Sequence, residues 1–355
     1  MSEAAEPDPF AAATAAGVHR LSIPTPFAIG RVNVYLIEDE PLTLIDAGPN
    51  SGTSFDELTR GLEGLGHSLE EIERVVITHQ HIDHLGLVGL VASRSGAEVA
   101  AIDHAVPIVE RFSEEMQADD EFATATMLRH GIPQDVVRAL QSVSRAFRAW
   151  GAPATVTHVL HEGDELAFRD RMLKVHWRPG HSPTDTVFED SERRMLIAAD
   201  HLLAHISSNP LITRPIDGSG DRPQSLVTYL DSLARTRAMD VDLVLPGHGP
   251  PVTDHRKTID ERFTLHRRRA DKLWRLIAER PRSAYELAQA LWGNIAVTQA
   301  YLTLSEVLGH TDILLNEGRV REVGDGDTVC FEAIEQPGAG DDGAVGAEGA
   351  AQPAG

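Results

Sequence analysis

Four side chains that can bind a metal ion lie within six residues, between His79 and His84. The stretch reads HQHIDH and follows an apolar, β-branched segment over residues 74–78. Side chains two residues apart in an extended chain point to the same side, so the rings of His79 and His81 can face one ion. Asp83 and His84 follow at the turn, where they can face a second ion. The pattern therefore predicts a metal site at the end of a buried strand.

Three more polar side chains follow apolar segments that are typical of strands. They are His181 after residues 172–177, Asp200 after residues 195–199, and His248 after residues 243–246. Gly and Pro residues surround His181 and His248, which indicates turns at these points. Open α/β architectures place their chemistry at such strand ends. We therefore expect these three residues to complete the metal site.

The complete set of candidate ligands resembles that of the metallo-β-lactamase-fold superfamily, and most closely its glyoxalase II-like hydrolases. The resemblance covers residues from about 21 to 248, and segments 33–37 and 44–48 match two early strands of the family. It implies that one metal is held by His79, His81 and His181, and the other by Asp83, His84 and His248, with Asp200 as the bridge. Imidazole and carboxylate ligands suit two zinc ions, and iron or manganese also accept them.

Two departures from the family pattern bear on the substrate. Many relatives carry a second histidine shortly after the first ligand turn, where this chain has Ser182-Pro183-Thr184-Asp185-Thr186. Antibiotic-hydrolysing members place a cysteine at the second metal, but the single cysteine of this chain is Cys330, far beyond His248. The sequence therefore argues against a true β-lactamase.

The resemblance implies a binuclear hydrolase in which a hydroxide that bridges the metals attacks a carbonyl carbon. We expect a thioester or ester substrate of the acyl-CoA or acyl-glutathione kind, with Asp83 as a catalytic residue that orients the hydroxide or carries a proton. The same ligand pattern leaves open a metal-dependent endoribonuclease, a lactonase and a mono-iron persulfide dioxygenase. A metal-containing regulatory binding protein with slow turnover is the non-enzyme alternative.

The fold class expected for residues 19–254 is α+β, an αββα sandwich in which two strand-rich blocks supply ligands to a shared rim. Residues 104–150 interrupt the alternation of strands and helices, and their sequence predicts a helical cap. Its apolar side chains either pack the helices or form a wall for an acyl or aryl group. The candidate substrate contacts are Phe112, Phe122 and Trp150 in the cap, and His201 and His205 beside Asp200. Histidines elsewhere, including His266 and His310, are expected to be structural.

Residues 255–328 predict a small C-terminal domain of two helices and a hairpin, which resembles the winged-helix-like tail of some superfamily members. The hairpin strands are expected at 313–315 and 319–323. Arginines 267, 268 and 269 lie in the first helix among Asp260, Glu261, Asp271 and Glu279. This segment is either a solvated helix face or a binding surface for RNA.

The net charge of −22 opposes a general affinity for nucleic acid. No apolar run approaches the length of a membrane span. Residues 1–18 predict a disordered arm rather than a signal peptide, and residues 329–355 predict a disordered tail. With one cysteine and no export signal, we expect a cytoplasmic protein that acts on a small molecule. A monomer and a homo-oligomer both stay open.

Overall fold

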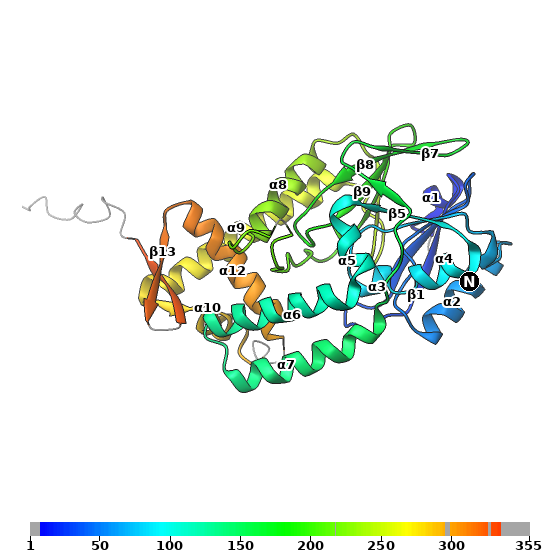
Figure 1. Ribbon diagram of the computed structural model, residues 1–355. Coiled ribbons are helices and arrows are strands. Elements are labelled where there is room, and N and C mark those ends of the chain that lie inside the picture. Colours follow the sequence, from blue (N-terminus) through cyan, green and yellow to red (C-terminus); the bar gives the residue numbers. More distant parts are fainter. Residues whose placement is uncertain (1–7, 217, 295–298, 326–327, 335–355) are drawn as a thin grey trace, which may run out of the picture.

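Two β-sheets lie face to face at the centre of the part of the chain that precedes the C-terminal helices (Figure 1). The computed structural model describes residues 8–216, 218–294, 299–325 and 328–334. The first sheet has six strands, which are neighbours in chain order: β1 (Val18–Ile23), β2 (Val32–Ile37), β3 (Thr43–Ile45), β4 (Arg74–Val76), β5 (Glu98–Ile102) and β6 (His158–Leu160). The first three strands pair antiparallel, and β3 to β6 pair parallel.

The second sheet has five strands and supplies three of the predicted ligands. Its order is β11 (Leu243–Pro246), β10 (Met195–Ala199), β9 (Thr186–Asp190), β8 (Met172–Trp177) and β7 (Glu165–Ala167). Only the pair of β10 and β11 is parallel, and the other pairs are antiparallel. Because β10 and β11 run in the same direction, Asp200 and His248 emerge at the same edge of this sheet.

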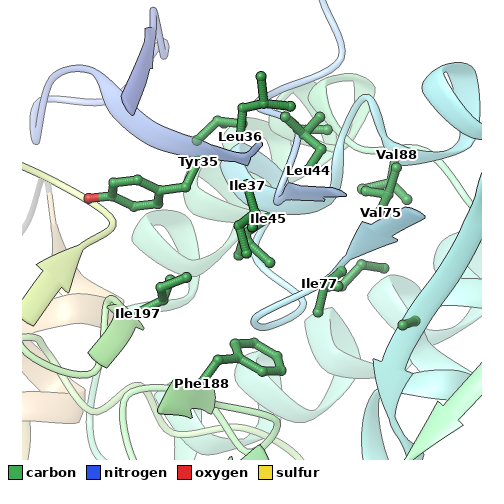
Figure 2. Packing of buried hydrophobic residues seen from close by; sticks show 14 of the residues in the cluster. Tyr35, Leu36, Ile37, Leu44, Ile45, Val75, Ile77, Val88, Phe188 and Ile197 are labelled. Atoms are coloured by element: carbon green, nitrogen blue, oxygen red, sulfur yellow. The ribbon is translucent and has the colours of Figure 1, made fainter. Parts of the chain in front are cut away.

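The main hydrophobic core lies between the two sheets. Side chains alternate along a strand, so Ile197 of β10 faces the first sheet while its neighbours Leu196 and Ala198 face outward. Figure 2 shows Ile197 and Phe188 of the second sheet opposite Ile45 of the first. This interlocking of apolar side chains fixes the two sheets relative to each other.

Helices cover both outer faces. Helices α2 (Gly52–Gly64) and α4 (Val88–Ser95) pack on the first sheet, whereas α8 (Ser225–Arg237) and α9 (His255–Glu279) cover the second. The expected αββα sandwich is thus confirmed. Two short elements, the 3₁₀ helix η1 (Leu69–Glu71) and the one-turn helix α3 (Ile82–Leu85), flank β4.

The insertion between β5 and β6 is helical, as predicted. It consists of η2 (Asp103–Ala105), α5 (Val106–Glu110), α6 (Phe112–Arg129), α7 (Gln134–Phe147) and η3 (Arg148–Trp150). Helices α6 and α7 reach away from the sandwich towards the C-terminal elements (Figure 1). Met127, Ile132 and Val137 at their far ends share a hydrophobic cluster with Leu273 of α9. The insertion therefore connects the sandwich to the C-terminal region through apolar contacts.

The C-terminal region follows the order helix, strand, helix, helix and hairpin. After α9 come β12 (Arg282–Ser283), α10 (Ala284–Trp292), α12 (Ala300–Asn316), β13 (Val320–Asp325) and β14 (Thr328–Ala333). The three strands form a small antiparallel sheet in the order β12, β14, β13. The winged-helix-like interpretation of this region stays a prediction.

The predicted hairpin is wrong in its position. Residues 313–315 belong to α12, because Leu314 continues the buried side of that helix with Val307 and Leu308. Gly318, at φ 67°, adopts the left-handed conformation that ends the helix. The turn around Gly318 thus joins a helix to β13, and the hairpin forms between β13 and β14.

Both predicted disordered ends are too long. Residues 8–18 contain helix α1 (Ala11–Ala15) and the start of β1, and Phe10 is buried with its ring centroid 6.4 Å from that of Tyr35. Strand β14 occupies the start of the predicted tail, and its Phe331 is fully buried. Residues 1–7 and 335–355 lie outside the described residues, and with them the rest of both predictions. No helix among the described residues has both the length and the apolar character to cross a membrane.

Candidate metal centre

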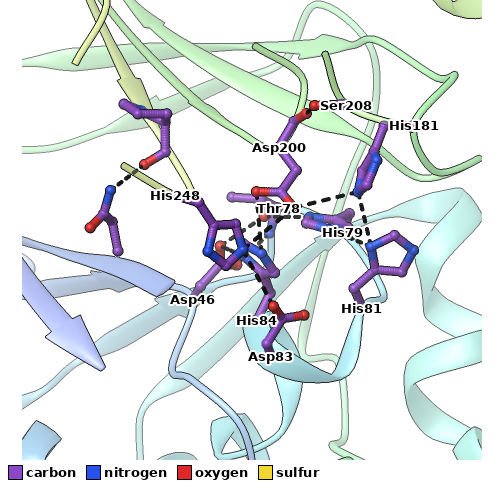
Figure 3. Close-up of polar contacts among 12 residues, drawn as sticks. Asp46, Thr78, His79, His81, Asp83, His84, His181, Asp200, Ser208 and His248 are labelled. Atoms are coloured by element: carbon purple, nitrogen blue, oxygen red, sulfur yellow. Dashed lines mark hydrogen bonds and ion pairs between the residues drawn. The ribbon is translucent and has the colours of Figure 1, made fainter. Parts of the chain in front are cut away.

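The seven predicted ligands converge at one edge of the sandwich, where strands of both sheets end (Figure 3). Those of the HQHIDH stretch lie in the loop after β4 and in α3, and the remaining three follow strands of the second sheet. Main-chain hydrogen bonds join the sheets at this edge, from Thr186 to Thr78 at 2.9 Å and from Asn33 to Gly247 at 2.7 Å. Loops that are tied together in this way hold ligands from distant parts of the chain in place.

Three imidazoles form the first group, with Asp200 beside them. Nδ1 of His81 lies 3.0 Å from Nε2 of His79 and 3.0 Å from Nε2 of His181. Two nitrogens bound to one tetrahedral zinc at 2.0–2.1 Å are separated by about 3.3 Å. These separations are therefore close to those that a shared metal requires.

The second group consists of Asp83, His84 and His248, and Asp200 links it to the first. Nε2 of His248 lies 3.3 Å from Oδ2 of Asp83 and 3.6 Å from Oδ2 of Asp200. The Asp200 carboxylate also lies 3.6 Å from Nε2 of His84 and 3.5 Å from Nε2 of His181. One carboxylate thus stands between ring nitrogens of both groups.

In four imidazoles the ring nitrogen that points away from the centre, here called the outer nitrogen, makes a hydrogen bond. This bond fixes the orientation of the ring and therefore of the nitrogen that faces the centre. Nδ1 of His84 donates to Asp46 at 2.7 Å, Nδ1 of His181 to the carbonyl of Asn209 at 3.0 Å, and Nδ1 of His248 to the carbonyl of Arg31 at 2.8 Å. Nδ1 of His79 donates to the Thr78 hydroxyl, whose own proton goes to Asp46. In the neutral form of each of these rings the proton therefore lies on Nδ1, and Nε2, which faces the centre, is the nitrogen available for metal ligation.

Protonation states differ between the two groups. Burial, and then the rings of His84 and His81, lower the pKa of His79 well below its usual range. Burial followed by His181 lowers the pKa of His81 to about 3. Burial also disfavours protonation of His84, but Asp46 and Asp200 outweigh it and raise the pKa of that ring. His79 and His81 are thus neutral, the form in which histidine binds metals.

Unpaired polar atoms test whether the site fits metal ions. Nε2 of His84, Nε2 of His248 and Oδ1 of Asp200 are buried and have no hydrogen-bond partner among the described residues. Buried polar atoms are normally hydrogen-bonded, and each that is left unpaired costs about 1–3 kcal/mol. Coordination would satisfy all three atoms at once, so the residues fit a metal centre.

Asp46 supports the site, although the sequence alone indicated only that it lies at the end of a predicted strand. Its carboxylate accepts from the Thr78 amide at 2.9 Å, from the Thr78 hydroxyl at 2.8 Å and from His84. Its φ of 61° is rare for residues other than glycine and turns the side chain towards α3. The signal in the sequence was an acidic residue at the end of an apolar strand, two positions before a glycine.

Gly247 allows two ligands to approach the loop after β11. A Cβ atom at this position would lie 2.3 Å from Oδ1 of Asp200 and 2.8 Å from Cε1 of His84. Neither contact is possible for a real side chain. The glycine before His248 is therefore a requirement of the site.

The segment that departs from the family pattern joins two ligand turns. The Ser182 hydroxyl donates to Oε1 of the Gln80 side chain at 2.9 Å, and the main-chain N–H of Gln80 donates to the Thr184 hydroxyl at 3.2 Å. Asp185 accepts from the Ser182 amide at 2.9 Å, and its burial raises its pKa to about 6. These buried contacts tie the loop of His79 and His81 to the loop of His181.

The predicted substrate contacts do not form one surface. Phe112 is 3% exposed in the main core, where its ring packs against Gly151, and Phe122 packs instead with the C-terminal cluster. His201 is buried and bonded to the Thr236 hydroxyl at 2.8 Å. These placements assign packing roles and do not support substrate contact. Trp150 is half-buried and His205 is exposed, so both stay candidates.

Comparisons of the sequence agree with this geometry. Residues 28–248 match the family model described as the metallo-beta-lactamase superfamily. The chain is 32% identical over 325 residues to the "Probable metallo-hydrolase YqjP" of Bacillus subtilis (strain 168), which covers 91% of this chain and all of that protein.

Two solved structures share the fold over nine-tenths of the chain. The metallo-beta-lactamase family protein TTHA1429 from Thermus thermophilus has a TM-score of 0.76 at 26% identity, covering 90% of this chain and 99% of that one. A beta-lactamase domain protein from Burkholderia ambifaria also has a TM-score of 0.76 at 26% identity, with 90% and 92% covered. Sequence, fold and ligand arrangement together establish that this chain belongs to the metallo-β-lactamase superfamily.

Proposed function

We propose that this protein is a binuclear metal-dependent hydrolase that acts on a thioester or ester. The observation that carries the proposal is the position of Asp200, within 3.6 Å of ring nitrogens from both ligand groups. A carboxylate in that position suits a bridge between two metals. The printed name of the Bacillus subtilis relative, a probable metallo-hydrolase, agrees with hydrolysis.

The ligand assignment follows from the two groups of side chains. His79, His81 and His181 would hold one ion, Asp83, His84 and His248 the other, and Asp200 both. Two such ions supply Lewis acidity and an activated water. Zinc suits these ligands, and iron and manganese are alternatives.

Asp83 has a further role in this proposal. Its Oδ2 lies 3.3 Å from Nε2 of His248, at the start of α3. A carboxylate in that position can accept a proton from water and later return it to a leaving group. Removal of the carboxylate should therefore lower kcat more than KM.

Two features favour an acyl substrate over RNA. The chain carries a net charge of −22, which repels a polyanion. In the basic helix α9, Arg267 pairs with Glu317 at 2.6 Å, and Arg269 pairs with Glu306. Arginines already neutralised within the protein offer less charge to phosphates.

A substrate panel tests the proposal. Purified protein is assayed with acyl-CoA, acyl-glutathione, a lactone and RNA, and the His79→Ala variant serves as the inactive control. Thioester or ester turnover that is lost in this variant is the expected result. RNA cleavage without turnover of any acyl substrate would instead establish the endoribonuclease, which the predicted winged-helix-like character of the C-terminal region would favour.

The arginines provide a second discrimination. Replacing Arg267 and Arg268 with Ser should leave acyl hydrolysis unchanged, because both side chains are exposed on α9. In a nuclease guided by this helix, the same changes would weaken RNA binding and flatten its salt dependence, since fewer counterions are released. Arg269 is left intact because it pairs with the buried carboxylate of Glu306.

A further inference from the structure

The loop that follows β10 carries Asp200 and also supports a second ligand, His181. The Ser208 hydroxyl donates to the main-chain carbonyl of Asp200. The carbonyl of Asn209 accepts from Nδ1 of His181 at 3.0 Å, and the Leu211 amide donates to the carbonyl of His181 at 3.3 Å. The orientation of the His181 ring thus depends on where residues 208–211 lie.

Helix α12 of the C-terminal region anchors this loop at three points. The Ser305 hydroxyl accepts from the Ile212 amide at 3.3 Å, and the Tyr301 hydroxyl donates to the Ile212 carbonyl. The Asn209 side chain donates to the carbonyl of Leu302 at 3.2 Å. Both ends of one short loop segment are therefore bonded to a single helix.

Helix α9 provides a second support through a series of hydrogen bonds. The Ser207 hydroxyl lies 3.0 Å from Nε2 of His266, and Nδ1 of His266 lies 3.1 Å from Nε2 of His310. Nδ1 of His310 in turn donates to the carbonyl of Glu306 at 2.6 Å. His266, Glu306 and His310 are close enough together to be considered as a third metal group. The ring nitrogens of both histidines are already hydrogen-bonded in this series, however, and Arg269 pairs with Glu306.

The other ligands take their outer hydrogen bonds from the sandwich itself. His84 and His79 are held through Asp46 and Thr78, and His248 through Arg31. Among the imidazoles with a described outer partner, His181 alone is held by the loop that α12 anchors. Support from the C-terminal region therefore acts on the group of His79, His81 and His181, and leaves the ring orientations of the other group unaffected.

We propose that the C-terminal region is a positioning element of the metal centre, and that Tyr301 and Ser305 act through Asn209 to orient His181. Loss of the two hydroxyls releases the loop, so Nε2 of His181 no longer points steadily at the metal position. Partners that orient a ligand in this way typically contribute about 10–100-fold to metal affinity. This inference rests on the proposed metal binding.

The test uses the full chain with Tyr301→Phe, and with Tyr301→Phe combined with Ser305→Ala. Titration of the zinc-loaded protein with a chelator resolves the two ions as two steps. The double variant should lose one ion at least about 10-fold more easily, and the affinity for the other, which shares only Asp200 with this loop, should change less. His248→Ala, which removes a ligand of the other group only, should weaken the opposite step and so identifies the two.

Asn316→Ala is the matched control, because Asn316 in the same helix bonds to Gln224 at 2.8 Å, away from the ligand loop. It should leave both steps unchanged. Tyr301→Phe preserves the shape of the side chain and keeps the test interpretable if the double variant fails to fold. Unchanged affinities in a folded Tyr301→Phe variant, or equal weakening of both steps, would overturn this inference alone. Wild-type protein that binds no metal would overturn the proposed function, and this inference with it.

Discussion

The Asp46 carboxylate accepts a hydrogen bond of 2.7 Å from Nδ1 of His84, and this contact determines which nitrogen of that ring faces the candidate metal centre. The same carboxylate accepts from the amide and the hydroxyl of Thr78. Asp46 thus serves three donors at once. An amide in its place has one acceptor oxygen and must direct its own donor group at one of these partners.

Asp46→Asn is therefore expected to impair metal binding without unfolding the protein. Asparagine tolerates the φ of 61°, but its NH₂ group favours the His84 tautomer with the proton on Nε2, which opposes coordination. The affinity for the ion at Asp83, His84 and His248 should fall about 10–100-fold. Chelator competition measures this change, and an unaltered affinity would show that Asp46 does not orient His84.

Gly247→Ala should remove metal binding by a steric route. The added methyl group would lie 2.3 Å from Oδ1 of Asp200, so either the carboxylate or the turn before His248 must move. Gly64→Ala in α2 is the matched control, because a Cβ there meets no atom within 4 Å. Elemental analysis should find less metal in the Gly247 variant and wild-type content in the control. Full metal content in the Gly247 variant would refute the close approach.

A buried ion pair away from the site leads to a pH-dependent prediction. Oδ2 of Asp39 lies 3.1 Å from Nε of Arg171, and both side chains are buried. Burial acts to raise the pKa of Asp39, but the Glu40 amide and Arg171 outweigh it and hold that pKa below its usual value. The unfolded chain therefore binds this proton more readily than the folded one, and the pair stabilises the fold at neutral pH.

Asp39→Asn should lower the free energy of unfolding at pH 7 by about 3 kcal/mol, because it leaves Arg171 buried without its partner. The difference from wild type should shrink as the pH falls through the pKa of folded Asp39, since the wild-type carboxylate then becomes neutral as well. Urea denaturation at pH 7 and pH 3 measures both values. Asp170→Asn, on an exposed side chain, should have little effect at either pH. A constant difference across this pH range would contradict the assignment.

Two aromatic residues of the helical insertion should respond differently to truncation. Phe112 is 3% exposed in the main core, so Phe112→Ala should cost about 3–5 kcal/mol of stability and lower activity equally for short and long acyl chains. Trp150 is half-buried beside the loop of Asn50, and its truncation should raise KM more for long chains than for short ones. Measurement of KM and kcat for substrates of different acyl chain length distinguishes the two responses. Equal losses for Trp150→Ala would assign that residue to packing as well.

The loops that bring the candidate ligands together could be predicted because their signal is local. Each of these loops follows an apolar strand, so the loop of His79 after β4 and the position of Asp200 after β10 could be recognised one at a time. The partnership of Asp46 and His84 joins residues 38 positions apart and depends on an unusual backbone angle. The periodicity of apolar residues in the sequence gives no information about such a contact.

The same limit explains the errors at the C-terminal end. Residues 313–315 are apolar and bounded by a turn, which fits a strand as well as a helix. Their burial against neighbouring helices makes them the end of α12. Phe122 was expected near the substrate because of its place in the insertion, but tertiary packing carries it to the C-terminal cluster. Both outcomes depend on contacts between segments that are distant in the sequence.

The central claim is that one centre built from seven side chains holds two metal ions. Elemental analysis of purified wild-type protein, with His79→Ala measured in parallel, tests it most directly. The account predicts close to two transition-metal ions per chain in the wild type, and loss of much of the metal together with hydrolysis in the variant. Wild-type protein that is active without metal, or a variant that retains both ions and full activity, would contradict it.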